Sequence, residues 1–226
     1  MKVIENLAHI QAQIKEACQK VDRDPEDIKI IAVTKYVTIE RTQEALQAGI
    51  NDFGENRPDG FQAKYAAIGK QAQWHFIGTL QSRKVKDVID KMDYLHSLDR
   101  KSLAKEINKR AEKPVDCFVQ VNVSGEDSKH GLAVDEVIPF VELLKDYSNI
   151  HVVGLMTMAP HISDEERLRD VFRSLRQLRD TIVEADYDHA PCRFLSMGMS
   201  NDYQIAIQEG ATHIRIGSDL VGPYQE

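Results

Sequence analysis

The residue with the clearest chemical potential in this sequence is Lys35. It ends the stretch Ile30-Ile31-Ala32-Val33-Thr34-Lys35, whose β-branched apolar residues are typical of a buried strand. Because side chains alternate along a strand, Lys35 shares a face with Ile31 and Val33, where burial favours the neutral amine over the ammonium. A neutral amine attacks aldehydes to form Schiff bases. The alternative is that Lys35 lies one residue beyond the strand, in solvent.

Two turns near the C-terminus have the composition of anion-binding sites. The turn Ser196-Met197-Gly198-Met199-Ser200 follows one strand-like run, and Gly217-Ser218 follows the last. Glycine lets the backbone approach a ligand closely, and exposed N–H groups with nearby hydroxyls suit a phosphate. Most such pairs only turn the chain. Their place after the seventh and eighth strands, where barrels often bind phosphate, favours the phosphate interpretation.

An arginine in the last strand-like run adds a fixed cation. Arg215 shares one strand face with His213, and the isoleucines on either side of Arg215 share the other face. An inward-facing arginine needs an acceptor, because it keeps its charge and carries five donors. That acceptor is either a carboxylate, with Glu55 and Asp99 as the candidates, or a ligand.

An amine, a phosphate site and a cation together match pyridoxal 5′-phosphate (PLP), which offers an aldehyde, a phosphate and a ring nitrogen. An arginine that faces the ring nitrogen disfavours its protonation and so weakens the ring as an electron sink. Such a site is better suited to holding the cofactor than to driving carbanion chemistry.

The elements that must position these residues alternate between strand and helix. Strand-like runs cover residues 28–35, 52–56, 74–78, 94–99, 116–122, 151–156, 193–198 and 213–217, and helix-like segments cover 40–48, 61–68, 82–90, 102–111, 135–147, 165–185 and 203–209. This α/β pattern predicts one domain over residues 1–226, a closed (β/α)8 TIM barrel with an extra N-terminal helix within residues 1–24. An open doubly wound sheet is the alternative, but it usually has a glycine-rich fingerprint where this chain has Lys35.

Composition narrows the classes of function. The 226 residues carry a formal net charge of −7, which argues against a nucleic-acid backbone binder. The absence of a signal-like segment or of about 18 consecutive apolar residues predicts a cytoplasmic protein without a membrane span. The three cysteines lack partners at metal-ligand spacing, so no metal site is predicted; they are Cys18, Cys117 and Cys192.

Seven segments resemble the YggS/PROSC family of PLP homeostasis proteins, which share the barrel of alanine racemase. They begin with Ala32-Val33-Thr34-Lys35 and end with Arg215-Ile216-Gly217-Ser218, so the resemblance spans nearly the whole chain. The segments between them are Phe53-Gly54-Glu55-Asn56-Arg57, Trp74-His75-Phe76-Ile77-Gly78-Thr79-Leu80-Gln81-Ser82-Arg83-Lys84, Gln120-Val121-Asn122-Val123-Ser124, Gly154-Leu155-Met156-Thr157-Met158 and Leu195-Ser196-Met197-Gly198-Met199-Ser200.

The resemblance implies a role for each matching residue. It implies that Lys35 forms the Schiff base and that Arg215 faces the pyridine nitrogen. It places Asn56 and His75 about the cofactor, and further contacts come from Ser196, Met199 and the phosphate-holding residues Ser200, Gly217 and Ser218. A β-rich C-terminal domain, which alanine racemase-like enzymes need, is not expected, because only Asp219 to Glu226 follow the last strand.

The leading hypothesis is a PLP carrier and regulator in vitamin B6 homeostasis, not an enzyme, with PLP-dependent apo-enzymes as clients. We expect a monomer or weak homodimer that binds neither nucleic acid nor membrane. One rival is a PLP-dependent racemase or decarboxylase, a second is a cofactor-free Schiff-base aldolase, and a third is a pure interaction protein.

Two features leave their alternatives open. Lys129 is a second transient amine or part of a solvated loop. The arginines at 169, 173 and 176 form a solvated helix face or contact an anionic partner.

Overall fold

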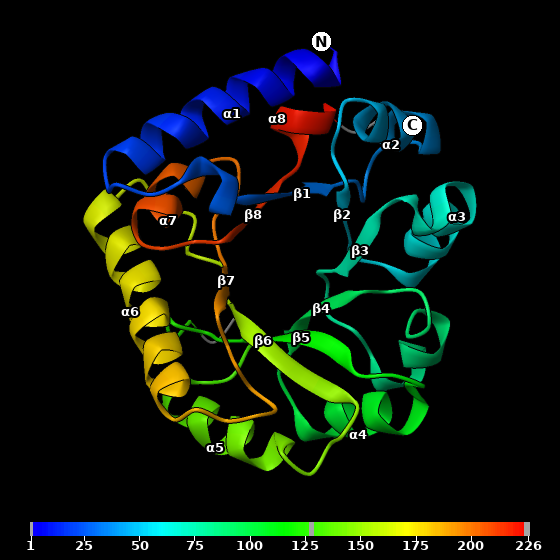
Figure 1. Ribbon diagram of the computed structural model, residues 1–226, viewed down its shortest axis with the longest axis vertical. Coiled ribbons are helices and arrows are strands. Elements are labelled where there is room, and N and C mark those ends of the chain that lie inside the picture. The colour runs from blue at the N-terminus through cyan, green and yellow to red at the C-terminus, as the bar shows by residue number, and fades with distance from the viewer. Residues whose placement is uncertain (1, 127–128, 224–226) are drawn as a thin grey trace.

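The computed structural model describes residues 2–126 and 129–223, and its strands close into a parallel barrel (Figure 1). Each strand pairs with the next, and β8 pairs with β1, so the predicted (β/α)8 barrel is confirmed. The strands are β1 (Lys29–Val33), β2 (Asp52–Glu55), β3 (Gln73–Phe76), β4 (Tyr94–Leu98), β5 (Val115–Gln120), β6 (Ile150–Met156), β7 (Phe194–Ser196) and β8 (His213–Ile216). In the described part of the chain, no further strand follows β8.

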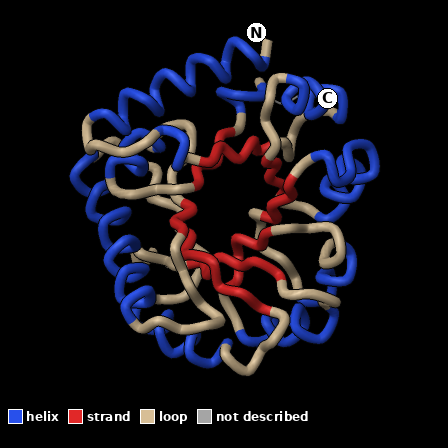
Figure 2. Tube along the Cα trace, viewed as in Figure 1, coloured by secondary structure: helices blue, strands red, loops and turns tan. Residues whose placement is uncertain are grey.

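The helices form a ring around the strands (Figure 2). They are α1 (Val3–Gln19), α2 (Ile39–Gln47), α3 (Pro58–Ile68), α4 (Lys101–Arg110), α5 (Val134–Leu144), α6 (Glu165–Glu184), α7 (Tyr203–Gln208) and α8 (Ser218–Val221), with the 3-10 turns η1 (Pro25–Asp27), η2 (Gly69–Gln71) and η3 (Ser82–Asp87). The helix predicted over 82–90 is the shorter η3, which opens with a backbone bond from the Lys84 N–H to the Gln81 carbonyl.

The extra N-terminal helix is confirmed as α1, which packs outside the barrel against α7 and α8 (Figure 1). Leu7, Ile10 and Ile14 recur at helical spacing and are buried, as the amphipathic pattern predicts. The buried Asn6 amide donates to the Leu220 carbonyl at 2.9 Å, so α1 also bonds to the segment that follows β8. The helix therefore supports the loops at one side of the barrel mouth.

The arginines of α6 bind a single carboxylate on the neighbouring helix. Arg169 and Arg173 lie 3.5 and 3.3 Å from Glu209 Oε1, and Arg176 lies 3.6 Å from Oε2. Glu209 follows α7 and is buried. The arginine face therefore helps to dock α6 on α7 and is not simply a solvated surface.

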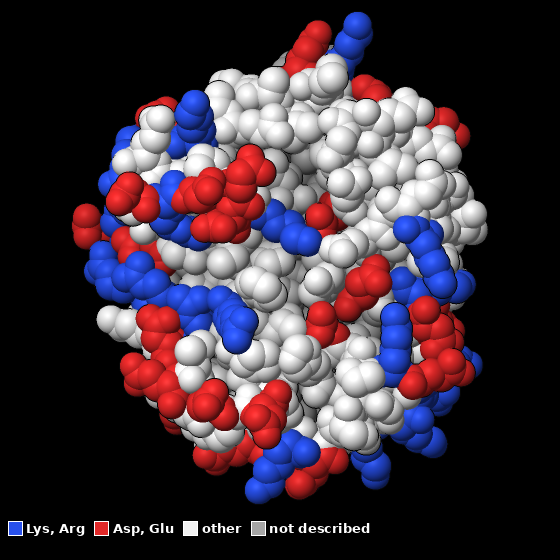
Figure 3. All heavy atoms as spheres, viewed as in Figure 1, with Lys and Arg blue, Asp and Glu red and all other residues white. Residues whose placement is uncertain are grey.

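The surface carries charged side chains of both signs (Figure 3). On the face seen in Figure 3, acidic and basic side chains lie side by side along the left, lower and right parts, and the upper right part is largely uncharged. Among residues 2–126 and 129–223, no helix combines the length and apolar character that crossing a bilayer requires. Within the same ranges, no group of three or more His, Cys, Asp or Glu side chains is arranged to hold a metal ion.

Candidate functional site

Lys35 lies in the turn after β1 and is exposed, so the expectation of a buried amine is wrong. The strand ends at Val33, two residues earlier than the sequence pattern predicts. The Thr34 N–H still bonds to Gly54 of β2, but the next backbone bond runs from Val37 back to Thr34 and turns the chain. Lys35 Nζ lies 4.8 Å from the centroid of the Tyr36 ring. The amine is therefore accessible from solvent at the carboxyl-end mouth of the barrel.

A buried ion pair lies under the segment that carries Lys35. Lys64 Nζ of α3 lies 2.6 Å from Glu55 Oε1 and donates to the Thr34 carbonyl at 2.5 Å. The Thr34 hydroxyl donates to the same carboxylate oxygen at 2.6 Å. Sequence reasoning missed Lys64, although it lies on the apolar stripe between Phe61 and Ile68, where a lysine needs a partner.

Arg215 points into the barrel from β8, as predicted. Its Nη1 donates to Ser196 Oγ at 2.6 Å and its Nη2 donates to the Thr157 carbonyl at 3.0 Å. Burial lowers the pKa of Arg215 to about 10, so the guanidinium keeps its charge at neutral pH. The carboxylate alternative is wrong, because Glu55 pairs with Lys64 and Asp99 pairs with Arg100.

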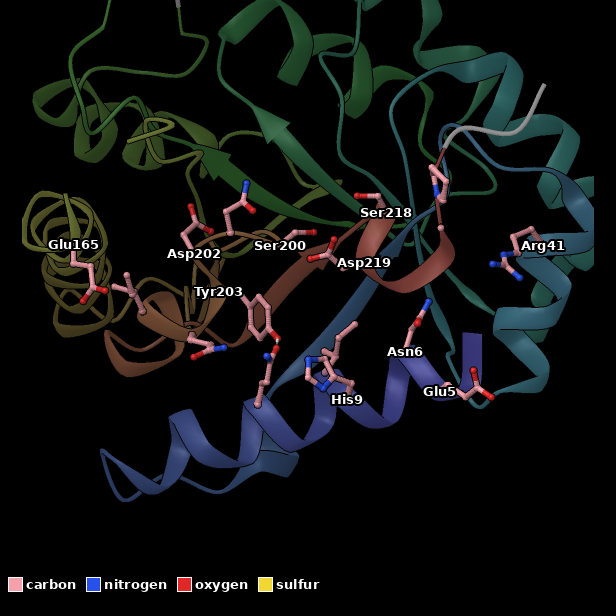
Figure 4. A pocket seen from close by; sticks show the side chains of 17 residues that line it. Glu5, Asn6, His9, Arg41, Glu165, Ser200, Asp202, Tyr203, Ser218 and Asp219 are labelled. Atoms are coloured by element: carbon pink, nitrogen blue, oxygen red, sulfur yellow. Dashed lines mark hydrogen bonds between the residues drawn. The ribbon is translucent and has the colours of Figure 1, made fainter. Parts of the chain in front are cut away.

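The two predicted phosphate turns follow neighbouring strands, β7 and β8. Ser200 and Ser218 line one wall of a cavity of about 770 Å³ that α1 and α7 also border (Figure 4). A Cβ built on Gly217 would meet only Val33, at 3.9 Å, so a ligand can approach this backbone closely. Gly198 has a φ of +95°, and a Cβ there would lie 2.7 Å from that of Ala206, so the first turn requires glycine.

Met199 and Asn56 lie at the same mouth. Met199 is 36% exposed, and its N–H donates to Asp202 Oδ1 at 2.6 Å. Asn56 follows β2 and is half-buried. A Cβ on Gly78 would lie 2.4 Å from the Asn56 carbonyl oxygen. Only glycine at position 78 therefore lets the backbone after β3 pass so close to Asn56.

His75, which the resemblance places about the cofactor, lies inside the barrel and not at its rim. It is fully buried in the barrel; its Nε2 is 2.8 Å from Asp52 Oδ1, and its Nδ1 is 2.9 Å from His96 Nε2. Asp52 begins β2 and therefore lies at the opposite mouth. The sequence motif extends beyond the end of β3 at Phe76, so it does not reveal that His75 faces inward from the middle of a strand.

Ser196 lies beneath the rim and accepts a hydrogen bond from Arg215. It also contacts His96, which the sequence pattern did not predict as a site residue. His96 Nδ1 lies 2.9 Å from Ser196 Oγ, although the two are 100 positions apart in the chain. The structure thus brings Lys35, Arg215 and the serines of both turns to one end of the barrel, because parallel strands place all their carboxyl ends there.

These features define the class of protein. Residues 6–225 match the family model described as Alanine racemase, N-terminal domain. Among solved structures, an unknown protein from Bifidobacterium adolescentis is 31% identical with a TM-score of 0.93, over 97% of this chain and 94% of that one.

More similar in sequence is the pyridoxal phosphate homeostasis protein of Aquifex aeolicus, 40% identical over 98% of each chain. The structure of PipY from Synechococcus elongatus with PLP bound is 27% identical with a TM-score of 0.83, over 97% of this chain and all of that one. The chain belongs to the pyridoxal phosphate homeostasis protein family within the alanine racemase N-terminal class.

Proposed function

We propose that this protein binds PLP as a Schiff base on Lys35 and serves as a carrier and regulator of the cofactor. The observation that carries the proposal is Arg215, a buried cation on the strand next to the one that Lys35 follows. Its hydrogen bonds go to Ser196 and to the Thr157 carbonyl, and no ion pair within 4 Å joins it to a carboxylate among the described residues, although the buried Asp202 acts on it electrostatically. The names of the relatives and the PLP in PipY support the same cofactor.

The residues present fit PLP on chemical grounds. The Lys35 amine suits the aldehyde, the Ser200 and Ser218 hydroxyls with the open backbone at Gly217 suit the phosphate, and Arg215 suits the ring nitrogen. Two of the five Arg215 N–H groups bond to Ser196 and Thr157, which leaves donors for a ligand. Lys35 follows β1, Ser200 follows β7, and Arg215 and Ser218 lie in or just after β8. In the barrel, β8 lies between β7 and β1.

The residues of this chain favour binding over catalysis. Bound PLP supplies an electron sink, which works best when its ring nitrogen is protonated. Because Arg215 stays charged, it donates to that nitrogen and disfavours its protonation. Around the mouth, Tyr36, Met158 and Met199 are 50%, 39% and 36% exposed. An accessible mouth assists exchange of the cofactor with client apo-enzymes and does not exclude water from a reaction.

Lys129, on the loop after β5, is the candidate for a second amine during transfer of the cofactor. Its Nζ lies 3.4 Å from the Met158 carbonyl and 3.3 Å from Glu126 Oε1.

The proposed compartment is the cytoplasm. The three cysteines are free and buried, which supports a reducing environment.

The test is to load the purified protein with PLP, record its visible spectrum, reduce it with borohydride and map the modified lysine by mass spectrometry. We expect an imine absorption band and one pyridoxyl adduct, on Lys35. Lys35→Ala should lose both. Lys70→Ala is the matched control, because Lys70 is exposed in η2 before β3, at the opposite mouth, and should leave both unchanged.

Two results would contradict the proposal. A single adduct on Lys129 or Lys64 would overturn the assignment of Lys35. Turnover of an amino acid by the loaded protein at about 1 s⁻¹ or faster would favour a racemase or decarboxylase over a carrier.

A further inference from the structure

A continuous line of polar side chains runs through the inside of the barrel. Barrel interiors are usually filled by branched apolar residues, and a buried polar group is costly unless it is hydrogen-bonded. Here five side chains, one each from β2, β3, β4, β7 and β8, bond one to the next. This interior column consists of Asp52, His75, His96, Ser196 and Arg215.

The interior column connects the two mouths of the barrel. At the mouth opposite Lys35, Asp52 Oδ1 also accepts a hydrogen bond from Lys29 Nζ at 3.0 Å, and the Lys29 side chain is 33% exposed. At the other end, Arg215 faces the proposed cofactor. The members between these ends are fully shielded from water.

The carboxylate end of the column sets the direction of its hydrogen bonds when both histidines are neutral. Arg215 only donates, so Ser196 Oγ accepts from it at 2.6 Å. Ser196 Oγ lies 2.9 Å from His96 Nδ1 and donates to it when the proton of a neutral His96 is on Nε2. A carboxylate only accepts, so His75 Nε2 donates to Asp52 at 2.8 Å. Between them, His96 Nε2 donates to His75 Nδ1 at 2.9 Å. Each interior member thus accepts one bond and donates the next.

This pattern requires both histidines to be neutral. Burial lowers the pKa of His75 and places that of His96 well below the ordinary value. Burial opposes ionisation of Asp52, but its contacts with His75 and Lys29 outweigh that effect and lower its pKa. The column therefore has one cationic end and one anionic end, joined by neutral groups of fixed tautomer.

We propose that the interior column positions Arg215 for the ring nitrogen of PLP, with His75 and His96 as positioning residues. Through Ser196, His96 fixes the guanidinium, and the charge of Asp52 at the far mouth polarises the intervening bonds. The inference rests on the proposed function and deepens it: residues that do not touch the cofactor set how firmly Arg215 holds it.

The first test is His96→Leu, which removes the acceptor of the Ser196 proton. We expect the dissociation constant for PLP to rise about tenfold or more, which corresponds to the loss of one hydrogen bond in a network that includes a charged group. We also expect the absorption maximum of bound PLP to shift. The matched control is His213→Phe. His213 is also buried inside the barrel on β8, but its Nδ1 bonds to Thr212, outside the column. This control should leave affinity and spectrum within about twofold of the wild type.

The second test acts from the opposite mouth. Asp52→Asn keeps the shape of the side chain and removes its charge, so we expect a smaller shift of affinity and spectrum in the same direction. If both variants bind PLP as the wild type does, the positioning role is overturned while the proposed function stands. If the wild type binds no PLP, the proposed function itself fails.

A measurement on the unaltered protein covers the case in which a variant does not fold. Nitrogen-15 NMR of the imidazoles should show His75 and His96 as neutral Nε2–H tautomers, both without PLP and with PLP added. A Nδ1–H tautomer of His96 would reverse the order of donors and overturn the column as described.

Discussion

At the residue scale, Lys64 and Glu55 form an ion pair almost without contact with water. Their side chains are 6% and 1% exposed, and the Lys64 amine also bonds to the carbonyl of Thr34, next to Lys35. Two charges removed from water lose most of what they gain by attraction, but removing one partner leaves the other charge uncompensated. The pair therefore fixes the segment that carries Lys35 more than it adds to net stability.

From this we predict that Lys64→Met lowers the free energy of unfolding by about 3 kcal/mol, measured by urea denaturation. The double variant Lys64→Met/Glu55→Leu should recover most of the loss, because no buried charge is left. Lys20→Met is the control: its partner Glu16 is exposed, and we expect no measurable change. A loss in Lys64→Met as small as in the control would contradict the prediction.

The residue types in the sequence indicated the chemistry of the candidate site, but they did not indicate how deeply each side chain is buried. The strand pattern of the sequence singled out Lys35 and Arg215. In the structure, Lys35 follows β1 and Arg215 lies in the neighbouring strand β8. The burial of Lys64 and the exposure of Lys35 depend on where β1 ends, which a β-branched run does not fix within two residues.

At the scale of elements, the docking of α6 on α7 depends on Glu209. Three arginines surround this buried carboxylate, and Arg176 also donates to the Glu209 carbonyl at 3.0 Å. The helix α7 follows the turn that contains Ser200, so its position affects the mouth of the barrel. A surface helix pair is thereby linked to the candidate phosphate site.

We predict that Glu209→Gln lowers the free energy of unfolding by about 1–2 kcal/mol and speeds amide hydrogen exchange in α7, because the arginines lose their shared anion. Asp170→Asn is the matched control, since Asp170 is exposed and pairs only with Arg173 among the described residues. Equal exchange rates in the two variants would show that Glu209 does not hold α7.

The alternation of strands and helices was predictable from the sequence, and the interior contacts were not. Apolar runs and turn residues mark each βα unit locally. The bond between His96 and Ser196 instead joins β4 to β7 and exists only because the sheet closes. A histidine within a short polar strand carries no local sign of a partner so distant in the chain.

At the scale of the whole molecule, the barrel contains three histidines that stay neutral when folded. Burial lowers the pKa of His213 to about 3, lowers that of His75 and places that of His96 well below the ordinary value. Below about pH 6.5 the unfolded chain binds protons that the folded chain does not. Stability is therefore complete above this pH and is lost as the pH falls.

We predict a loss of up to about 4 kcal/mol per pH unit below pH 6.5, from three groups at about 1.4 kcal/mol each. Urea denaturation at pH 7.5, 6.0 and 5.0 measures this slope. His213→Phe should reduce the slope by about a third, whereas His9→Gln should not change it, because His9 is exposed on α1. A slope that is the same in all three proteins would refute the link to the interior histidines.

The pairing of β1 with β8 joins the first and last strands of the barrel at a single seam, and the candidate cofactor site spans it. During synthesis Lys35 therefore emerges from the ribosome well before Arg215 and Ser218 do. The site that would hold the cofactor is therefore assembled only when β8 pairs with β1, so loading with PLP would report that the barrel has closed.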